Sequence, residues 1–133
     1  MENKVDLESI KNLIKQNPNI LGAYLYGSYA KETQGINSDI DIAVFGNNIY
    51  IKDLYDLLDK LQETTQKKVD LINLDNNLES MLGFQVIKYG KLLFTKDEHV
   101  KNKIQSRYAL KYFDDEAFRN RLSKNLNKKL GII

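Results

Sequence analysis

GSYAKETQGINSDIDIAV, residues 27–44, is the stretch that decides the fold of this 133-residue chain. Residues 20–26, just before it, are rich in β-forming side chains, so Gly27-Ser28 stands at the end of a predicted strand. Residues 29–32 are typical of one helical turn, and residues 38–45 predict a second strand. The stretch therefore predicts a turn built between two neighbouring strands.

Helical and strand patterns alternate on both sides of this stretch. Residues 6–16 have the apolar spacing of a helix, and Asp6 is placed to cap it. Further elements are predicted as a helix with leucines at 54, 57, 58 and 61, a strand over 68–74, a helix over 77–89 and a last strand over 91–95. This alternation predicts an α/β domain over residues 1–96, with helices packed on a small sheet.

The pattern of residues 97–133 predicts a C-terminal extension made of two helices. We expect this extension to pack on the domain or on a partner. Phe118, Leu122, Leu126 and Leu130 recur in it at four-residue spacing. Residues 101–133 hold nine Lys or Arg against three Asp or Glu, whereas residues 1–100 hold 11 against 15. Basic and aromatic residues interleave near Tyr108 and Tyr112, as in nucleic-acid binders. Those two tyrosines fall on one helical face, which packing explains more simply, so direct nucleic-acid binding is not expected.

Composition excludes several classes of protein. The chain has no cysteine, which excludes disulfides and thiolate metal sites, and its single histidine, His99, excludes a histidine cluster for zinc. It has no P-loop motif, and the absence of tryptophan argues against a glycosidase built on paired acids. With no apolar leader and no run of membrane-spanning length, we expect a soluble, cytoplasmic protein without a membrane partner.

Gly27 and Ser28 are candidates for binding an anion. A strand that ends in Gly-Ser at a helix start offers backbone N–H groups and a close approach for phosphate, and the hydroxyl adds a donor. The same dipeptide is also common in ordinary turns, so alone it indicates little.

The paired acids Asp39 and Asp41 are candidate metal ligands. Residues two apart in a strand face the same side, with Cα atoms about 6.6 Å apart. Both carboxylates can then reach one Mg²⁺ at about 2.1 Å, or help to hold two ions about 3.5–4 Å apart. A solvated, exposed pair of acids is the alternative. Asp70 is a third acid inside a predicted apolar strand, where it completes an oxygen cage if the two strands are neighbours.

The spacing of these residues carries a family resemblance. Ten residues separate Ser28 from Asp39, giving G-S-(ten residues)-D-x-D, with a third acid on a later strand. This pattern resembles the DNA polymerase β-like nucleotidyltransferase superfamily. Within it, the stretch is similar to the minimal nucleotidyltransferases encoded beside HEPN-domain proteins, and to the MntA-type adenylyltransferase antitoxins. The resemblance covers residues 20–95 and implies the polymerase β-like fold, with a small mixed sheet.

The resemblance also implies roles and partners. Gly27 and Ser28 would hold the nucleotide's β- and γ-phosphates, and Asp39, Asp41 and Asp70 would hold two Mg²⁺ ions. Asp70 would also help to deprotonate the acceptor, and Lys31 is a weaker candidate for the triphosphate. The implied reaction is AMP transfer from ATP to a tyrosine of a HEPN toxin encoded by a neighbouring gene. Transfer to a small molecule such as an aminoglycoside, or inhibition of a partner by binding alone, are the alternatives.

One residue departs from the family pattern. Relatives often have glycine where this chain has Glu32, so the geometry of the turn after Gly27-Ser28 is the uncertain feature of the predicted site. The spacing of the acids is unaffected.

Overall fold

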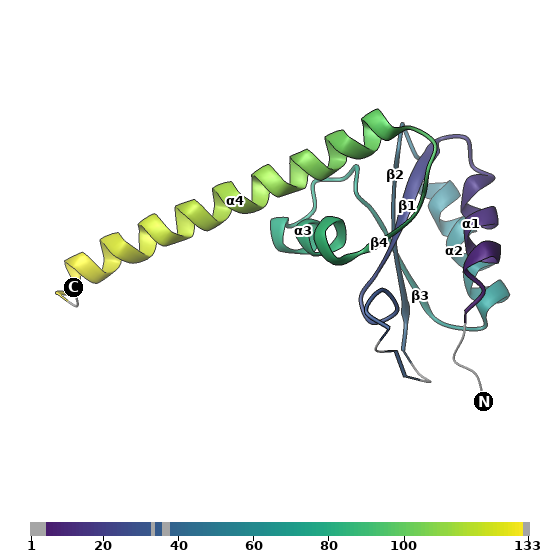
Figure 1. Ribbon diagram of the computed structural model, residues 1–133, viewed down its shortest axis with the longest axis horizontal. Coiled ribbons are helices and arrows are strands. Elements are labelled where there is room, and N and C mark those ends of the chain that lie inside the picture. Colours follow the sequence, from purple (N-terminus) through teal and green to yellow (C-terminus); the bar gives the residue numbers. More distant parts are fainter. Residues whose placement is uncertain (1–4, 33, 36–37, 132–133) are drawn as a thin grey trace.

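The computed structural model describes residues 5–32, 34–35 and 38–131. Four helices and four strands follow one another in these ranges (Figure 1). In chain order they are α1 (Leu7–Lys15), β1 (Ile20–Tyr26), β2 (Ile40–Gly46), α2 (Ile51–Thr65), β3 (Val69–Asn73), α3 (Ser80–Tyr89), β4 (Lys91–Thr95) and α4 (Glu98–Lys129). The predicted α/β class is confirmed, and element boundaries differ from the predicted ones mostly by one to three residues.

The four strands form one mixed sheet in the order β3-β2-β1-β4. β1 runs antiparallel to both β2 and β4, whereas β2 and β3 are parallel. The parallel pair is joined through α2, as a parallel connection requires. The two acid-bearing strands, β2 and β3, are therefore direct neighbours, which is the condition for Asp70 to join Asp39 and Asp41.

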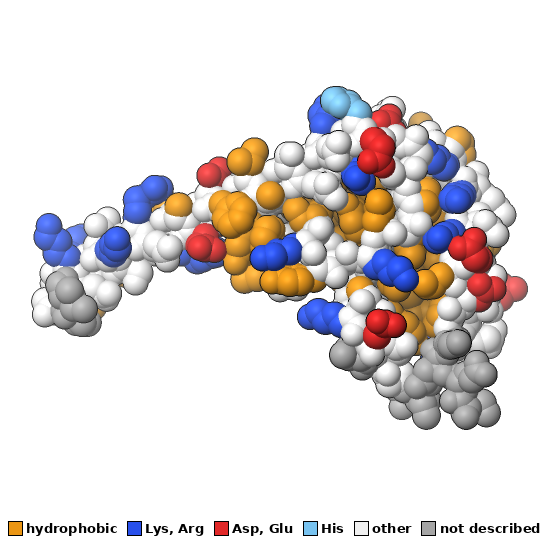
Figure 2. Space-filling view, in the orientation of Figure 1, with side chains coloured by type: hydrophobic (Ala, Val, Ile, Leu, Met, Phe, Trp, Pro, Cys, Tyr) orange, Lys and Arg blue, Asp and Glu red, His pale blue; other side chains and the backbone are white. Residues whose placement is uncertain are grey.

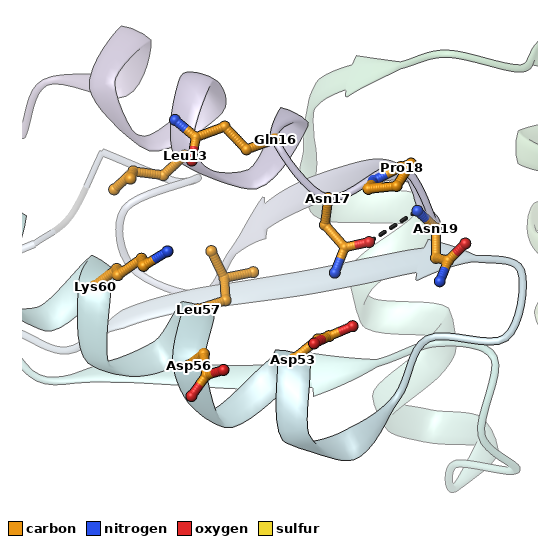
Figure 3. Close-up of a pocket in the computed structure, with 9 residues that line it drawn as sticks. All are labelled: Leu13, Gln16, Asn17, Pro18, Asn19, Asp53, Asp56, Leu57 and Lys60. Atoms are coloured by element: carbon orange, nitrogen blue, oxygen red, sulfur yellow. Dashed lines mark hydrogen bonds between the residues drawn. The ribbon is translucent and has the colours of Figure 1, made fainter.

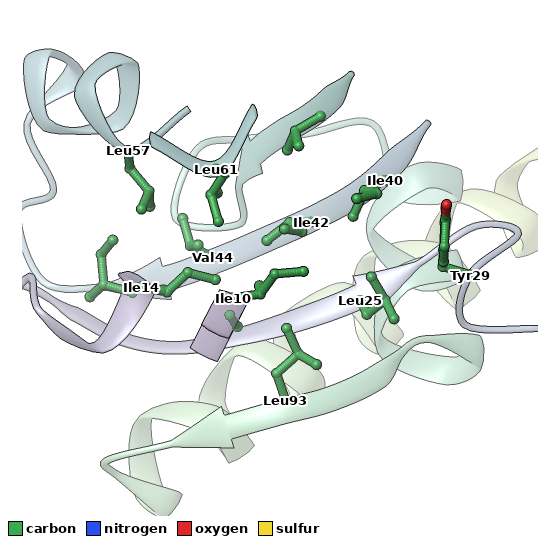
Figure 4. Packing of buried hydrophobic residues seen from close by; sticks show 13 residues of the cluster. Ile10, Ile14, Leu25, Tyr29, Ile40, Ile42, Val44, Leu57, Leu61 and Leu93 are labelled. Atoms are coloured by element: carbon green, nitrogen blue, oxygen red, sulfur yellow. The ribbon is translucent and has the colours of Figure 1, made fainter. Parts of the chain in front are cut away.

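One face of the sheet is covered by α1 and α2 (Figure 1). Alternate residues of β2 (Ile40, Ile42 and Val44) point to this face and are fully buried. They pack against Ile10 and Ile14 of α1 and against Leu57 and Leu61 of α2 (Figure 4). The period of two along the strand meets the apolar stripe of each helix, so this layer follows directly from the sequence pattern.

The other face is covered by α3 and the first part of α4. Tyr108 of α4 is fully buried, and its hydroxyl donates to the carbonyl oxygens of Leu74 (2.7 Å) and Asn76 (2.6 Å). Gly83 of α3 lets the helices approach closely, because a Cβ there would lie 2.1 Å from the Tyr108 ring. Tyr108 therefore fixes α4 both to α3 and to the loop after β3.

The extension is a single helix of 32 residues, so the prediction of two helices was wrong. No glycine or proline occurs between Gly90 and Gly131, and nothing in that stretch breaks the backbone hydrogen bonding. Beyond the α3 contact, α4 projects away from the sheet (Figure 1), and Phe118, Leu122 and Leu126 are about half exposed. Among the described residues, no helix is both long and apolar enough to cross a membrane.

Candidate active site

Three polar side chains form a row across the sheet at the end where β1 finishes and β2 and β3 begin. Tyr26 of β1 is paired with Asp41 of β2, and Asp41 is paired with Asp70 of β3. All three lie on the face that α3 and α4 cover further along, since Ala43 and Ile72, two residues on, pack in that layer. The sheet register thus brings Asp41 and Asp70 side by side, as the sequence predicted.

Asp39 lies just before β2 and is exposed. Partial burial raises the pKa of Asp41, and the negative charges of Asp70 and then Asp39 raise it further. Two of the three predicted acids, Asp70 and Asp39, therefore act electrostatically on the third, Asp41. Such a cluster is unfavourable when ionised and is relieved by a cation.

The carboxylates are not arranged as a closed metal cage. Over residues 5–32, 34–35 and 38–131, no group of three or more Asp, Glu or His side chains is positioned to hold a metal ion. Mg²⁺ in nucleotide-processing sites uses one or two carboxylates, and substrate phosphates and water complete its coordination. The possible metal ligands are all carboxylate oxygens, and they lie beside the Gly27-Ser28 turn. Such a donor set fits an ion that arrives with a nucleotide.

Gly27 packs directly against this cluster. Its φ of 72° lies in the left-handed region, and a Cβ at this position would meet Oδ2 of Asp41 at 2.2 Å. Both the backbone angle and the missing side chain are therefore required here. The predicted phosphate-binding residue and the predicted metal ligand touch in space, although fourteen positions separate them in the sequence.

The predicted helical turn at residues 29–32 is absent. Residues 27–32 form a hydrogen-bonded turn in which Lys31 N donates to the Gly27 carbonyl (3.3 Å) and Glu32 N to the Tyr29 carbonyl (3.4 Å). Glu32 then adopts a φ of 57°, which cannot continue a right-handed helix. The position where relatives often have glycine is thus one where the backbone favours glycine. Thr33, Ile36 and Asn37 lie outside the described residues.

Lys31, the remaining predicted site residue, is exposed on this turn. Its Nζ lies 6.0 Å from the centre of the Tyr89 ring, at the end of α3, and Lys88 Nζ lies 5.3 Å from the same ring. Two cations and a half-exposed aromatic ring therefore gather beside the Gly27-Ser28 turn. This is a suitable border for a polyphosphate, and the sequence analysis did not anticipate Lys88 or Tyr89.

Tyr26 is a third residue beside the predicted site that was not anticipated from the sequence. Its hydroxyl donates a long hydrogen bond to Oδ2 of Asp70 (3.5 Å), although β2 lies between the two strands. Burial raises the pKa of Tyr26, and the charges of Asp70 and Asp41 raise it further. The available signal was its position: an even-numbered residue at the end of β1 faces the same side as Tyr24.

A hollow elsewhere on the surface lies between α2 and the end of α1 (Figure 3). Asp53 and Asp56 of α2 border it, together with the turn around Pro18, where Asn17 Oδ1 accepts from Asn19 N at 2.8 Å. None of its lining residues belongs to the carboxylate row. The row itself remains the only place where the predicted site residues meet within the described ranges.

Known proteins resemble this chain in both sequence and fold. The family described as Polymerase beta, Nucleotidyltransferase matches residues 8–99. Protein adenylyltransferase MntA of Shewanella oneidensis is 38% identical over 97 residues. That alignment covers 70% of this chain and 64% of the relative, so it spans less than two thirds of the relative's length.

Two solved structures have a similar fold. A chain of a toxin–antitoxin crystal structure with AMP-PNP superposes with a TM-score of 0.77 and 28% identity, over 92% of this chain and 98% of that one. The second structure is the complex of a tri-AMPylated Shewanella oneidensis HEPN toxin with an MNT antitoxin. One of its chains superposes with a TM-score of 0.69 and 24% identity, over 90% of this chain and 94% of that one. The family match spans the whole carboxylate row and the sheet that carries it. This chain therefore belongs to the polymerase beta nucleotidyltransferase family.

Proposed function

We propose that this chain is a magnesium-dependent adenylyltransferase antitoxin, which transfers AMP from ATP to a tyrosine hydroxyl of a HEPN-family toxin encoded by a neighbouring gene. The observation that carries the proposal is the register of the sheet. It sets Asp41 against Asp70, with Asp39 near enough to influence Asp41 and with Gly27 in contact with Asp41.

Each residue of the site has a part in such a transfer. The backbone of Gly27 and the hydroxyl of Ser28 bind the β- and γ-phosphates, and Lys31 lies close enough to neutralise part of their charge. Asp39, Asp41 and Asp70 would hold two Mg²⁺ ions jointly with the phosphates of the bound nucleotide, and the ions would supply charge neutralisation at the transferred phosphate. Asp70 accepts the proton of the acceptor hydroxyl as the new oxygen–phosphorus bond forms and pyrophosphate leaves.

The similarities support this choice of donor and partner. The MntA relative is a protein adenylyltransferase, and the structure that is 28% identical to this chain is a toxin–antitoxin complex with an ATP analogue. A tyrosine of a HEPN toxin as the acceptor follows from the family resemblance alone.

The projecting part of α4 is the proposed docking surface for the toxin. Residues 117–131 carry five Lys or Arg and no acid, and Phe118, Leu122, Leu126 and Leu130 are half or more exposed. Figure 2 shows basic side chains along this far part of the molecule. A basic helix with an apolar stripe suits a partner surface that is apolar and acidic. On this proposal residues 1–96 are the catalytic domain, and 97–133 join it to its partner.

Intact mass of the neighbouring gene product tests the proposal. The partner is co-expressed with this chain or with its Asp41→Asn variant, and both are purified together. Added adenylyl units on a partner tyrosine with the wild type alone support it. Tight co-purification with both forms and no added mass would instead indicate inhibition by binding, and would prompt a screen of small-molecule acceptors such as aminoglycosides.

A further inference from the structure

The Tyr26 hydroxyl lies where an acceptor hydroxyl is needed. In the proposed reaction the acceptor must contact Asp70, which takes its proton, and must face the phosphate held beside Gly27. Tyr26 immediately precedes Gly27, and its hydroxyl is 3.5 Å from Oδ2 of Asp70. Its ring crosses the strand that carries Asp41, since Tyr26 and Asp41 are register partners. The chain thus presents a tyrosine of its own to its proposed catalytic base.

The hydroxyls of two other tyrosines on the same face of the fold have structural partners instead. Tyr24 Oη accepts from Gln105 Nε2 of α4 at 2.9 Å. Tyr108 Oη donates to two backbone carbonyls and is buried. Tyr26 is partly exposed, and its hydroxyl faces a catalytic carboxylate rather than the packing of the two layers.

We propose that Tyr26 is an acceptor in its own active site, so that the chain adenylylates itself. The inference rests on the proposed function. Tyr26 Oη attacks the α-phosphorus of bound ATP, and the bond from that phosphorus to the bridging oxygen of the β-phosphate breaks. Pyrophosphate leaves, and the phenol proton passes to Asp70. Because the hydroxyl already lies against Asp70 of its own chain, the reaction is intramolecular.

The product limits its own formation to one adenylyl group. A phosphodiester on Tyr26 places another negative charge beside Asp41 and Asp70, where the binding of a second triphosphate needs the same space. Like charges this close disfavour binding. Self-adenylylation therefore prevents further binding of ATP at this site. We expect one adenylyl group on the chain rather than a series of successive additions.

Mass spectrometry of the full chain tests this inference. The first sample is the chain as purified from cells without its partner gene, with no nucleotide added; the second is the same chain after incubation with ATP and Mg²⁺. We expect one adenylyl unit, which peptide mapping places on Tyr26. The unit is absent from Tyr26→Phe and Asp41→Asn, and it persists in the matched control Tyr24→Phe, which removes a hydroxyl from the same face of the same strand. An affinity-tagged Asp41→Asn chain mixed with the wild type stays unmodified.

The outcomes separate this inference from the proposed function. A wild-type chain that modifies its partner but never itself would overturn self-adenylylation and leave the proposed function standing. An addition that maps to another tyrosine, or that survives in Tyr26→Phe, would overturn it as well. If neither the partner nor the chain gains mass, both the proposed function and the inference fail.

Discussion

At the scale of single residues, Asp41 is the carboxyl group on which burial and the neighbouring charges of the site act together. Burial and the neighbouring charges of Asp70 and Asp39 raise its pKa, so the folded state resists ionisation of this carboxyl group. In the unfolded chain this carboxyl group ionises near its ordinary pKa of 3.8. Stability is therefore lost as the pH rises from about that value through the raised folded pKa, and the loss persists at neutral pH.

We expect Asp41→Asn to raise the melting temperature of the metal-free protein at pH 7. Relief of like charges opposite each other in a sheet contributes roughly 0.2–1 kcal/mol. The gain shrinks as the pH falls and vanishes below about 3.8, where the wild-type carboxyl becomes protonated in both states. Thermal melts from pH 3 to 8 in the presence of a chelator measure the difference in melting temperature between the variant and the wild type. Asp56→Asn on the exposed face of α2 is the control. A variant less stable than wild type at pH 7 would contradict this account of the site.

Gly27 combines a left-handed backbone conformation with close contact to Asp41, and both depend on its having no side chain. Gly27→Ala places a Cβ against Asp41 Oδ2 and keeps a φ of 72°, so we expect a loss of roughly 1–2 kcal/mol of stability. Displacement of Asp41 should also lower transfer by about 100-fold. Gly35→Ala is the matched control, because the nearest atom to its Cβ among the described residues is Ser38 Oγ, at 3.9 Å. Urea melts and transfer rates of both variants check the prediction; equal behaviour would contradict it.

Glu32 carries backbone strain in the turn that follows. Its φ of 57° is one that glycine adopts freely, so we expect Glu32→Gly to stabilise the fold by up to about 1 kcal/mol. Glu32→Ala, which removes the carboxylate and keeps the Cβ, controls for loss of charge and should not stabilise in the same way. Chemical denaturation measures the free energy of unfolding of both variants and of the wild type. Equal gains in both would assign the effect to charge rather than to the backbone.

At the scale of elements, the sequence predicted most of what the structure contains, for physical reasons. Period-two burial in β2 and the leucine face of α2 are strong local signals, and both elements form where predicted. The Gly-Ser and paired-acid motifs predicted Gly27, Asp39 and Asp41 as site residues, and an acid within an apolar strand predicted Asp70. The structure brings these residues together, and their roles stay predictions. These are properties of short segments, which local patterns describe well.

Features that depend on contacts between elements were less accessible from the sequence. The turn at 27–32 was predicted as helical because its residue types are compatible with a helix; the positive φ of Glu32 is set by the surrounding fold. Tyr26 was predicted only as the end of a strand, because its contact with Asp70 depends on the order of three strands. The continuity of α4 could have been predicted from the absence of glycine and proline between Gly90 and Gly131.

The projecting half of α4 yields a prediction about assembly. Leu122 and Leu126 are already about half exposed, so replacing both with serine should change the stability of the chain by less than about 1 kcal/mol. The same double change should abolish co-purification with the proposed toxin partner, since it removes the apolar stripe. Pull-downs of the tagged chain measure this, with Asn120→Ser and Asn125→Ser as controls on the same helix. Full retention of the partner by the leucine variant would exclude this stripe as the docking surface.

At the scale of the whole molecule, the two layers explain where the site lies. α1 and α2 close one face of the sheet, and α3 with the start of α4 closes the other (Figure 1). The carboxylate row lies at the end of the sheet, beside the Gly27-Ser28 turn, where the polar side chains are only partly covered. The rigid sheet thus sets the spacing of the acids, and α4 projects away from the same domain (Figure 1).

The rate of AMP transfer from α-labelled ATP to the purified partner tests the central claim most directly. It is measured for wild type, Asp39→Asn, Asp41→Asn and Asp70→Asn, each with Mg²⁺ and with a chelator, after melts confirm that all four fold. The account predicts transfer by the wild type in Mg²⁺, and losses of at least about 100-fold in each variant and in the chelator. Full transfer by Asp39→Asn and Asp41→Asn, or undiminished transfer without a divalent ion, would contradict it.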